Sequence, residues 1–151
     1  MPVQEPGTLN VAWLFRDTYK VIAVDNEKFE KVGRVNCDGE SSRLFVDIHL
    51  ELFPLEAGEV LDIGFVSTLQ PHQAEAEDQE TWDQSGAEAP VLNMFDYVMF
   101  GKIYRKTEDG GEVHVNVSFG GLLMKLSGSR KEFDAMHLDD RIYILASKVS
   151  A

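Results

Sequence analysis

The chain has 151 residues, and acidic side chains outnumber basic ones so that the formal net charge is −12. A length of this order fits one domain, and a hydrophobic content of 44% is enough for an ordinary core. The acidity argues against a free-standing binder of nucleic acid or of an anionic membrane surface, because both targets require clustered Lys and Arg. No apolar run approaches the ~20 residues of a membrane-spanning helix, so we expect no membrane association.

Residues 1–7 are polar and contain proline, and they lack the basic and apolar regions of a signal peptide. They belong to residues 1–10, which we expect to be a flexible extension. Residues 11–22 and 29–37 follow as weak strand candidates. The only cysteine, Cys37, cannot form an internal disulfide, which favours a reducing compartment such as the cytosol or nucleus.

Residues 43–53 show the clearest alternation of apolar and polar side chains, the pattern of a half-buried strand. Phe45 and Phe53 are exceptions on the polar face. Pro54 ends the run, because proline cannot donate to a sheet ladder. Residues 60–68 form a second, more apolar strand candidate. The apolar positions of the first run are Leu44, Val46, Ile48, Leu50 and Leu52.

Residues 70–90 differ from the rest of the chain. They contain six acidic residues, no basic residue and a single aromatic, Trp82. Such a composition cannot build a core, so we expect a long, mobile, acidic loop inserted between strands. A loop of this length is unusual in a compact domain and is typically either functional or disordered.

The next two strand candidates are joined at hairpin spacing. Residues 95–105 carry apolar or aromatic side chains on both faces, so we expect both faces to be covered in part. Residues 108–111 read Glu-Asp-Gly-Gly, and glycine supplies the positive φ that tight hairpin turns require. Residues 112–119 then alternate again, and the side chains expected to point inward are Val113, Val115, Val117 and Phe119.

Gly120 and Gly121 lie between two strand candidates, where they suggest a sharp bend or the close approach of another backbone. Leu122, Met124 and Leu126 continue the apolar pattern. Residues 129–138 contain the only plausible helical turn, with Phe133, Met136 and His137 at i, i+3 and i+4. Residues 141–149 close the chain with a strand that places Ile142, Ile144 and Ala146 on one side.

These segments amount to about eight short strands and almost no helix. A chain of this kind must close or stack its sheet to hide the strand edges, so a barrel or a sandwich follows. We therefore expect residues 1–151 to form a single all-β domain.

The sequence lacks the motifs that mark common catalytic and metal-binding sites. It contains no G-x-S-x-G, Walker A, HExxH or CxxC motif, and its four histidines are scattered singly. Asp38 follows Cys37 and should raise the pKa of the thiol rather than activate it. We expect no catalytic residue, no metal and no cofactor.

Four aromatic residues have two interpretations. Aromatic rings on the surface of a small barrel can stack on exposed bases. They can instead pack in the core or at a protein interface, which we favour because few basic residues lie near them in the sequence. The four are Tyr97, Phe100, Tyr104 and Phe119.

Two segments resemble a known family. Residues 95–105 resemble its Tyr-Val-Met-Tyr-Gly-Lys strand, and residues 117–128 resemble its Ser-Tyr/Phe-Gly-Gly-Leu-Leu-Met-Arg/Lys-Leu signature. The second motif is long and specific. Weaker similarity covers residues 14–17, 29–37, 50–54 and 141–145. The family is the small subunit common to the nuclear RNA polymerases I, II and III, known in polymerase II as the eighth subunit.

This resemblance implies an antiparallel, OB-like barrel of about eight strands with a long loop in the middle. It also implies a non-catalytic structural subunit that works in the nucleus and docks onto the largest polymerase subunit. Phe100 and Phe119 stand where the family commonly has tyrosine, so any hydroxyl hydrogen bond there is absent. The candidate partner-binding residues are Tyr97, Gly120, Gly121, Leu122, Leu123, Met124 and Lys125.

A second hypothesis remains open from the residues alone. A barrel of this kind could be an independent OB-fold protein that binds single-stranded nucleic acid or another ligand. The net charge opposes it, and we expect little or no direct nucleic-acid binding by the isolated chain.

Overall fold

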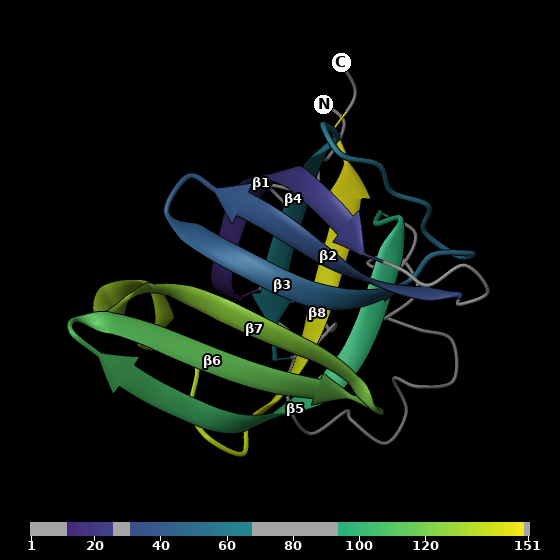
Figure 1. Ribbon diagram of the computed structural model, residues 1–151. Helices are drawn as coiled ribbons and strands as arrows, with labels where there is room; N and C mark the ends of the chain where they lie inside the picture. The colour runs from purple at the N-terminus through teal and green to yellow at the C-terminus, as the bar shows by residue number, and fades with distance from the viewer. Residues whose placement is uncertain (1–11, 26–30, 68–93, 150–151) are drawn as a thin grey trace, which may run out of the picture.

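The strands of the computed structural model form one closed antiparallel barrel (Figure 1). The structure describes residues 12–25, 31–67 and 94–149. Around the barrel the strands follow the order β1-β2-β3-β7-β6-β5-β8-β4, and β4 pairs with β1 to close the ring. The expected all-β, eight-stranded barrel is confirmed. Its strands are β1 (Trp13–Asp25), β2 (Val32–Gly39), β3 (Ser42–His49), β4 (Val60–Val66), β5 (Tyr97–Asp109), β6 (Glu112–Phe119), β7 (Leu122–Ser129) and β8 (Arg141–Lys148).

Two long strands, β1 and β5, close the barrel because each changes partner along its length. β1 pairs first with β4 and then with β2, and β5 pairs first with β8 and then with β6. The register shifts between Val21 and Ala23 in β1 and between Ile103 and Arg105 in β5. Irregularities of this kind bend a strand and increase its twist, which lets one strand serve two parts of a curved sheet.

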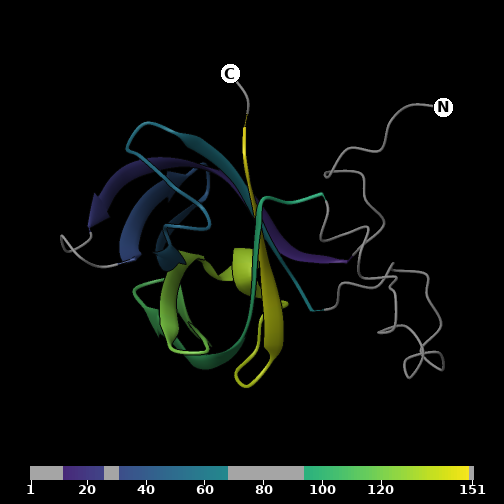
Figure 2. The same ribbon diagram turned by 90° about the vertical axis from the view of Figure 1, so that its right-hand side faces the viewer.

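The barrel interior is filled by the inward-facing side chains that alternation predicts. In β6 every second residue from Val113 to Phe119 is buried, and in β8 Ile142, Ile144 and Ala146 are buried as expected. A short 3-10 helix, η3 (Arg130–Phe133), stands where a helical turn was predicted. It lies at one end of the barrel next to β6 and β7 (Figure 1), so it overlaps the ring of strands in the view of Figure 2. Phe133 is fully buried, as is Met136 just beyond the helix. His137, predicted to share their face, is exposed.

The strand predicted at residues 43–53 is shorter than expected. Leu44, Val46 and Ile48 are buried as predicted, but β3 ends at His49. The backbone N–H groups of Leu52 and Phe53 both donate to the carbonyl of His49, at 3.0 and 3.1 Å, so the chain turns there. Because of this turn, the predicted orientations of the last two residues are wrong. Leu52, expected on the apolar face, is 69% exposed, and Phe53, expected on the polar face, is buried.

Both glycine pairs form tight hairpin turns. Gly110 and Gly111 connect β5 to β6 with φ of 61° and 86°, and Gly120 and Gly121 connect β6 to β7 with φ of 64° and 107°. An added Cβ at Gly120 or Gly121 would meet nothing within 4 Å. Close approach of another backbone is therefore not the reason for this pair, and the left-handed conformation of the turn is sufficient.

A second apolar cluster lies outside the main core. Val66, Phe95 and Leu145 are buried in it, with partly buried Trp13, Met94, Val98 and Tyr143 around them. Gly64 makes room for the cluster, because a Cβ there would lie 2.3 Å from the Trp13 ring. The expectation that both faces of β5 are covered thus holds for Val98, whereas Phe100 and Tyr104 are about half exposed.

The predicted N-terminal extension at residues 1–10 and the predicted acidic loop at residues 70–90 lie outside the described residues.

Candidate docking surface

The residues predicted to bind a partner divide between the interior and the surface. Gly120 and Gly121 form the β6–β7 turn. On β7, Met124 points into the barrel and is 2% exposed, whereas Leu123 is 39% exposed and Lys125 lies on the same outer face. Leu122 is partly buried and packs against the main core. Of the predicted set, Leu123 and Lys125 are therefore the residues whose side chains face outward.

Tyr97 lies inside the molecule. Its ring stacks on Phe53 with centroids 5.1 Å apart and an angle of 8° between the planes. Its hydroxyl accepts a hydrogen bond from the His49 N–H at 3.0 Å and donates to the Met99 sulfur at 3.3 Å. Burial raises the pKa of this phenol. Tyr97 is 7% exposed, so it ties the start of β5 to the turn after β3 and presents little surface to a partner.

Leu123 opens into a shallow depression of about 410 Å³ on the outer face of the barrel. The depression crosses β2, β3, β7, β6 and β5, which follow one another on the side of the barrel nearest the viewer in Figure 1. We call this surface the β7 groove. Its lining residues are Arg34, Phe45, Tyr104, Asn116, Leu123, Met124 and Lys125.

Strand register brings the lining residues together. Phe45 of β3 pairs with Lys125 of β7, and Lys125 also pairs with Asn116 of β6. Directly opposed residues on one face of a sheet have Cβ atoms only ~4.5–5.5 Å apart, so these three side chains are immediate neighbours. Phe45 and Lys125 are 80 positions apart in the sequence, and the pairing of β3 with β7 brings them together.

Asp47 holds one edge of the β7 groove. Its carboxylate accepts two hydrogen bonds from Arg34, at 2.7 Å from Nε and 3.1 Å from Nη2. It also accepts the backbone N–H of Leu123 at 2.9 Å. The recorded β3–β7 pairing ends at Val46 and Met124, so the Asp47 side chain extends the connection between these strands by one further residue. Leu123 is therefore held in place by its backbone while its side chain stays exposed.

The β7 groove is apolar at its centre and positively charged at its margin. Phe45, Tyr104 and Leu123 are between 38% and 47% exposed. The lining residues include the basic Arg34 and Lys125, and Arg105 pairs with Asn116 beside the groove. The Asp47 carboxylate at the edge is taken up by Arg34 and the Leu123 N–H. The sequence contained one sign of this surface, because Phe45 interrupted the polar face of its strand. Tyr104 had been noted only as one of four aromatics, two of which, Tyr97 and Phe119, are buried.

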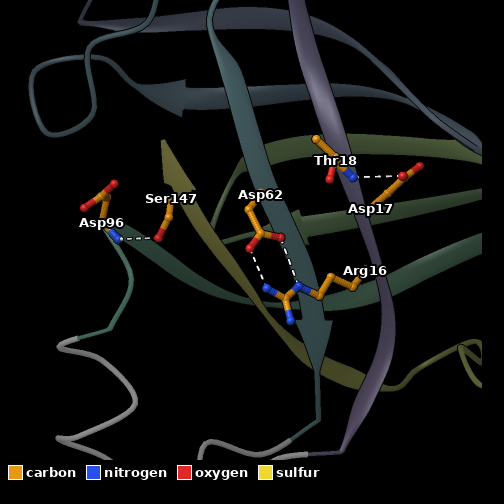
Figure 3. Close-up of polar contacts among 6 residues, drawn as sticks. All are labelled: Arg16, Asp17, Thr18, Asp62, Asp96 and Ser147. Atoms are coloured by element: carbon orange, nitrogen blue, oxygen red, sulfur yellow. Dashed lines mark hydrogen bonds and ion pairs between the residues drawn. The ribbon is translucent and has the colours of Figure 1, made fainter. Parts of the chain in front are cut away.

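A second hollow, of about 430 Å³, lies across β1 and β4, and most of its lining residues are charged or polar. Arg16 Nε donates to Asp62 Oδ1 at 2.9 Å across the two strands (Figure 3). Asp17 points the other way and is nearly buried. Its carboxylate accepts from the N–H groups of Thr18 and Ser41 at 2.8 and 3.0 Å. These contacts are all made between residues of the barrel itself. They give the weak family similarity of residues 14–17 a structural explanation.

The remaining titratable groups offer little chemistry. Burial, reinforced by the negative charge of Asp38, raises the pKa of the Cys37 thiol to about 12. The predicted direction is confirmed, although burial is the larger cause and the sequence argument named only Asp38. In the described part of the chain, no group of three His, Cys, Asp or Glu residues could hold a metal ion. None of the helices described is long and apolar enough to cross a membrane.

Comparison with known proteins places the chain in a family. The model of the family described as RNA polymerase Rpb8 matches residues 16–148, a range that includes all eight strands except the first residues of β1. The chain belongs to the RNA polymerase Rpb8 family. The family resemblance of residues 95–105 and 117–128 is thereby confirmed, and both motifs lie on the strands that build the β7 groove or on their turn.

Three relatives show how far the similarity extends. The Caenorhabditis elegans protein named probable DNA-directed RNA polymerases I, II, and III subunit RPABC3 is 34% identical over 89% of this chain and 95% of its own. The Saccharomyces cerevisiae subunit RPABC3 of polymerases I, II and III is 31% identical over 87% and 95%. The Arabidopsis thaliana protein named DNA-directed RNA polymerases II, IV and V subunit 8B is 29% identical over 90% and 96%.

Among solved structures, the cytoplasmic molybdate-binding protein ModG aligns over 87% of this chain and 89% of its own. The TM-score is 0.30 and the sequence identity is 11%, values too low to support an argument.

Proposed function

We propose that this protein is a non-catalytic structural subunit of DNA-directed RNA polymerase, shared by polymerases I, II and III, and that it works in the nucleus. The observation that carries the proposal is the family match over residues 16–148, which takes in nearly the whole barrel. The relatives from C. elegans and S. cerevisiae bear names that assign them to all three polymerases.

A structural role is supported by how the described barrel is filled. Large apolar side chains occupy its interior, among them Tyr19, Phe65 and Phe133, each fully buried. The one thiol is buried, and burial raises its pKa to about 12, in the direction opposite to the lowered pKa of a reactive cysteine. What such a barrel offers a large assembly is a rigid surface, because the positions of its outward side chains are set by strand register.

We further propose that the chain docks onto the largest polymerase subunit through the β7 groove. Leu123 and Phe45 support this role because exposed apolar side chains that gather in one place commonly mark protein interfaces. The Gly120–Gly121 turn and buried Met124 hold β7 in register beneath them. Tyr97 would contribute from inside the barrel, by fixing the start of β5.

Affinity purification tests the proposal. A tagged copy of the full chain should recover the largest polymerase subunit, and subunits specific to polymerases I, II and III should accompany it. Because many proteins in an extract bind nonspecifically, an Ile48→Asp copy with a disrupted core serves as a control. This copy should recover no polymerase subunit. Recovery of no polymerase subunit by the folded wild-type protein would contradict the proposed function.

The competing function is independent binding of single-stranded nucleic acid. The feature that favours it is the pair of half-exposed rings of Phe100 and Tyr104. The isolated protein should bind single-stranded DNA or RNA weakly or not at all at ~0.15 M salt, because the chain carries a net charge of −12. A fluorescence titration with labelled single-stranded oligonucleotides measures this. Sub-micromolar affinity would favour the alternative.

A further inference from the structure

We infer that the β7 groove receives a short acidic segment of a polymerase subunit, anchored by an apolar side chain of that segment. This inference rests on the proposed function and adds the chemistry of the partner. It is carried by an apolar centre that lies beside two cations, Lys125 and Arg105, which form no ion pair within the described residues.

The cations of the groove differ in what they contact. Arg34 is held by Asp47, as described above. Lys125 and Arg105 flank Asn116 on the two neighbouring strands, and within the described residues neither forms an ion pair. Other basic residues around this side of the barrel do, including Arg43 with Glu112 and Lys102 with Asp139. Two positive charges are thus left for a partner.

A negatively charged group of a partner would meet little electrostatic repulsion inside the groove. Glu112 is the one acidic residue of β6, and Arg43 holds its carboxylate and lowers its pKa, with Lys125 contributing at longer range. Asp47 is already engaged by Arg34 and the Leu123 N–H. A carboxylate of a partner could therefore approach Lys125 and Arg105 without displacing an internal ion pair.

The apolar centre of the groove requires an apolar side chain from the partner in addition to negative charge. Phe45, Tyr104 and Leu123 surround a depression of about 410 Å³, a size suited to one or two apolar side chains. An extended segment with an apolar residue flanked by Asp or Glu would fill the depression and pair with both cations. Nucleic acid fits less well, because Lys125 and Arg105 could neutralise only two phosphates while the whole chain repels a polyanion.

Site-specific photo-crosslinking tests the inference. The full chain is tagged, assembled into polymerase in cells, and carries a benzophenone amino acid in place of Tyr104, with a second copy carrying it at Ile22 as control. Ile22 is 44% exposed but lies on β1, outside the groove. We expect the Tyr104 probe, and not the Ile22 probe, to crosslink to a polymerase subunit at a segment rich in Asp and Glu.

Each other outcome of the crosslinking counts against the inference. A crosslink from position 104 to a basic segment, to nucleic acid, or to nothing while polymerase co-purifies would overturn it and leave the proposed function standing. Failure of both copies to recover any polymerase subunit would instead contradict the proposed function on which the inference rests. The two failures are therefore distinguished by the composition of the purified material.

Charge reversal gives an independent readout. Lys125→Glu should reduce recovered polymerase by at least about tenfold, because like charges facing each other at an interface are strongly unfavourable. Lys20→Glu, an equal change at an exposed position of β1 away from the groove, should leave recovery within about twofold of wild type. Melting curves of both purified variants should match wild type. Equal recovery of the two variants would overturn the inference.

Discussion

The Asp17 carboxylate accepts a 2.7 Å hydrogen bond from the Ser42 hydroxyl, which connects β1 to the first residue of β3. The same carboxylate accepts the N–H groups of Glu40 and Ser41 in the turn between β2 and β3. Gly39 permits this arrangement, because a Cβ there would lie 2.5 Å from Asp17 Oδ2. One nearly buried carboxylate therefore organises a hairpin that is more than twenty residues away in the sequence.

Asp17→Ala should destabilise the protein. It leaves the buried Ser42 hydroxyl without its carboxylate acceptor, which costs about 1–3 kcal/mol. The N–H groups of Glu40 and Ser41, at exposed positions, lose a hydrogen bond to a charged acceptor and can bond to water instead. We expect the free energy of unfolding to fall by about 2–4 kcal/mol in urea titrations. Asp38→Ala removes an exposed carboxylate from the adjacent strand and should change it by less than about 0.5 kcal/mol. Similar effects of the two variants would refute the structural role of Asp17.

Ile48→Asp should unfold the chain or make it insoluble. Ile48 is 3% exposed, and a carboxylate in its place would be buried without a partner, at a cost of several kcal/mol against a total stability of ~5–15 kcal/mol. Phe45→Asp is the matched control, because Phe45 lies on the opposite face of the same strand and is 38% exposed. Circular dichroism and gel filtration compare the two. A folded Ile48→Asp protein would mean that the register of β3 is incorrect.

The Cys37 thiol should be inaccessible to thiol reagents in the folded protein. Its ionisation should also lower the stability of the fold in alkali. Its pKa rises from 9.0 in an exposed thiol to about 12 on folding. As the pH increases past about 9, the unfolded chain therefore releases this proton first, and stability declines until the pH passes about 12. Burial raises the pKa of Tyr19 as well, which adds to the loss in the same direction.

Two measurements check the behaviour of Cys37. A maleimide should label no thiol in native protein at neutral pH and one thiol per chain in denaturant. Urea titrations at about pH 7 and pH 10 should show a smaller loss of stability for Cys37→Ala than for wild type, because the substituted chain has no thiol to ionise. Rapid labelling of the native protein would contradict the burial of this side chain.

Leu123→Asp should weaken assembly without unfolding the domain. Leu123 is 39% exposed and its backbone is held by Asp47, so the melting temperature should stay within about 2–3 °C of wild type. Recovery of the largest polymerase subunit should fall by about tenfold or more, which corresponds to ~1.4 kcal/mol of binding free energy. Leu138→Asp, at a 55% exposed site beyond η3, is the control and should retain the partner. A large fall in melting temperature would instead assign Leu123 to the core.

Alternation along the chain was a reliable guide wherever one face of a strand meets the core. It identified the buried positions of β6 and β8 and those of Leu44, Val46 and Ile48 in β3, because successive residues of a strand point to opposite faces whatever the strand pairs with. It failed at Leu52 and Phe53, where hydrogen bonds to the His49 carbonyl end the strand and rotate the next residues. A turn of that kind has no strong sequence signal, since Pro54 lies one residue beyond it.

The family and the all-β class were accessible from the sequence alone, because specific motifs and local periodicity need no knowledge of distant contacts. The β7 groove was not. Phe45, Tyr104 and Leu123 are exposed, and outward-facing residues follow no pattern that reveals which of them are neighbours. The β5–β6 and β6–β7 hairpins are local, so the long-range pairing of β3 with β7 decides that these three side chains share one depression. Tyr97, equally aromatic and on the same strand as Tyr104, turns inward to stack on Phe53.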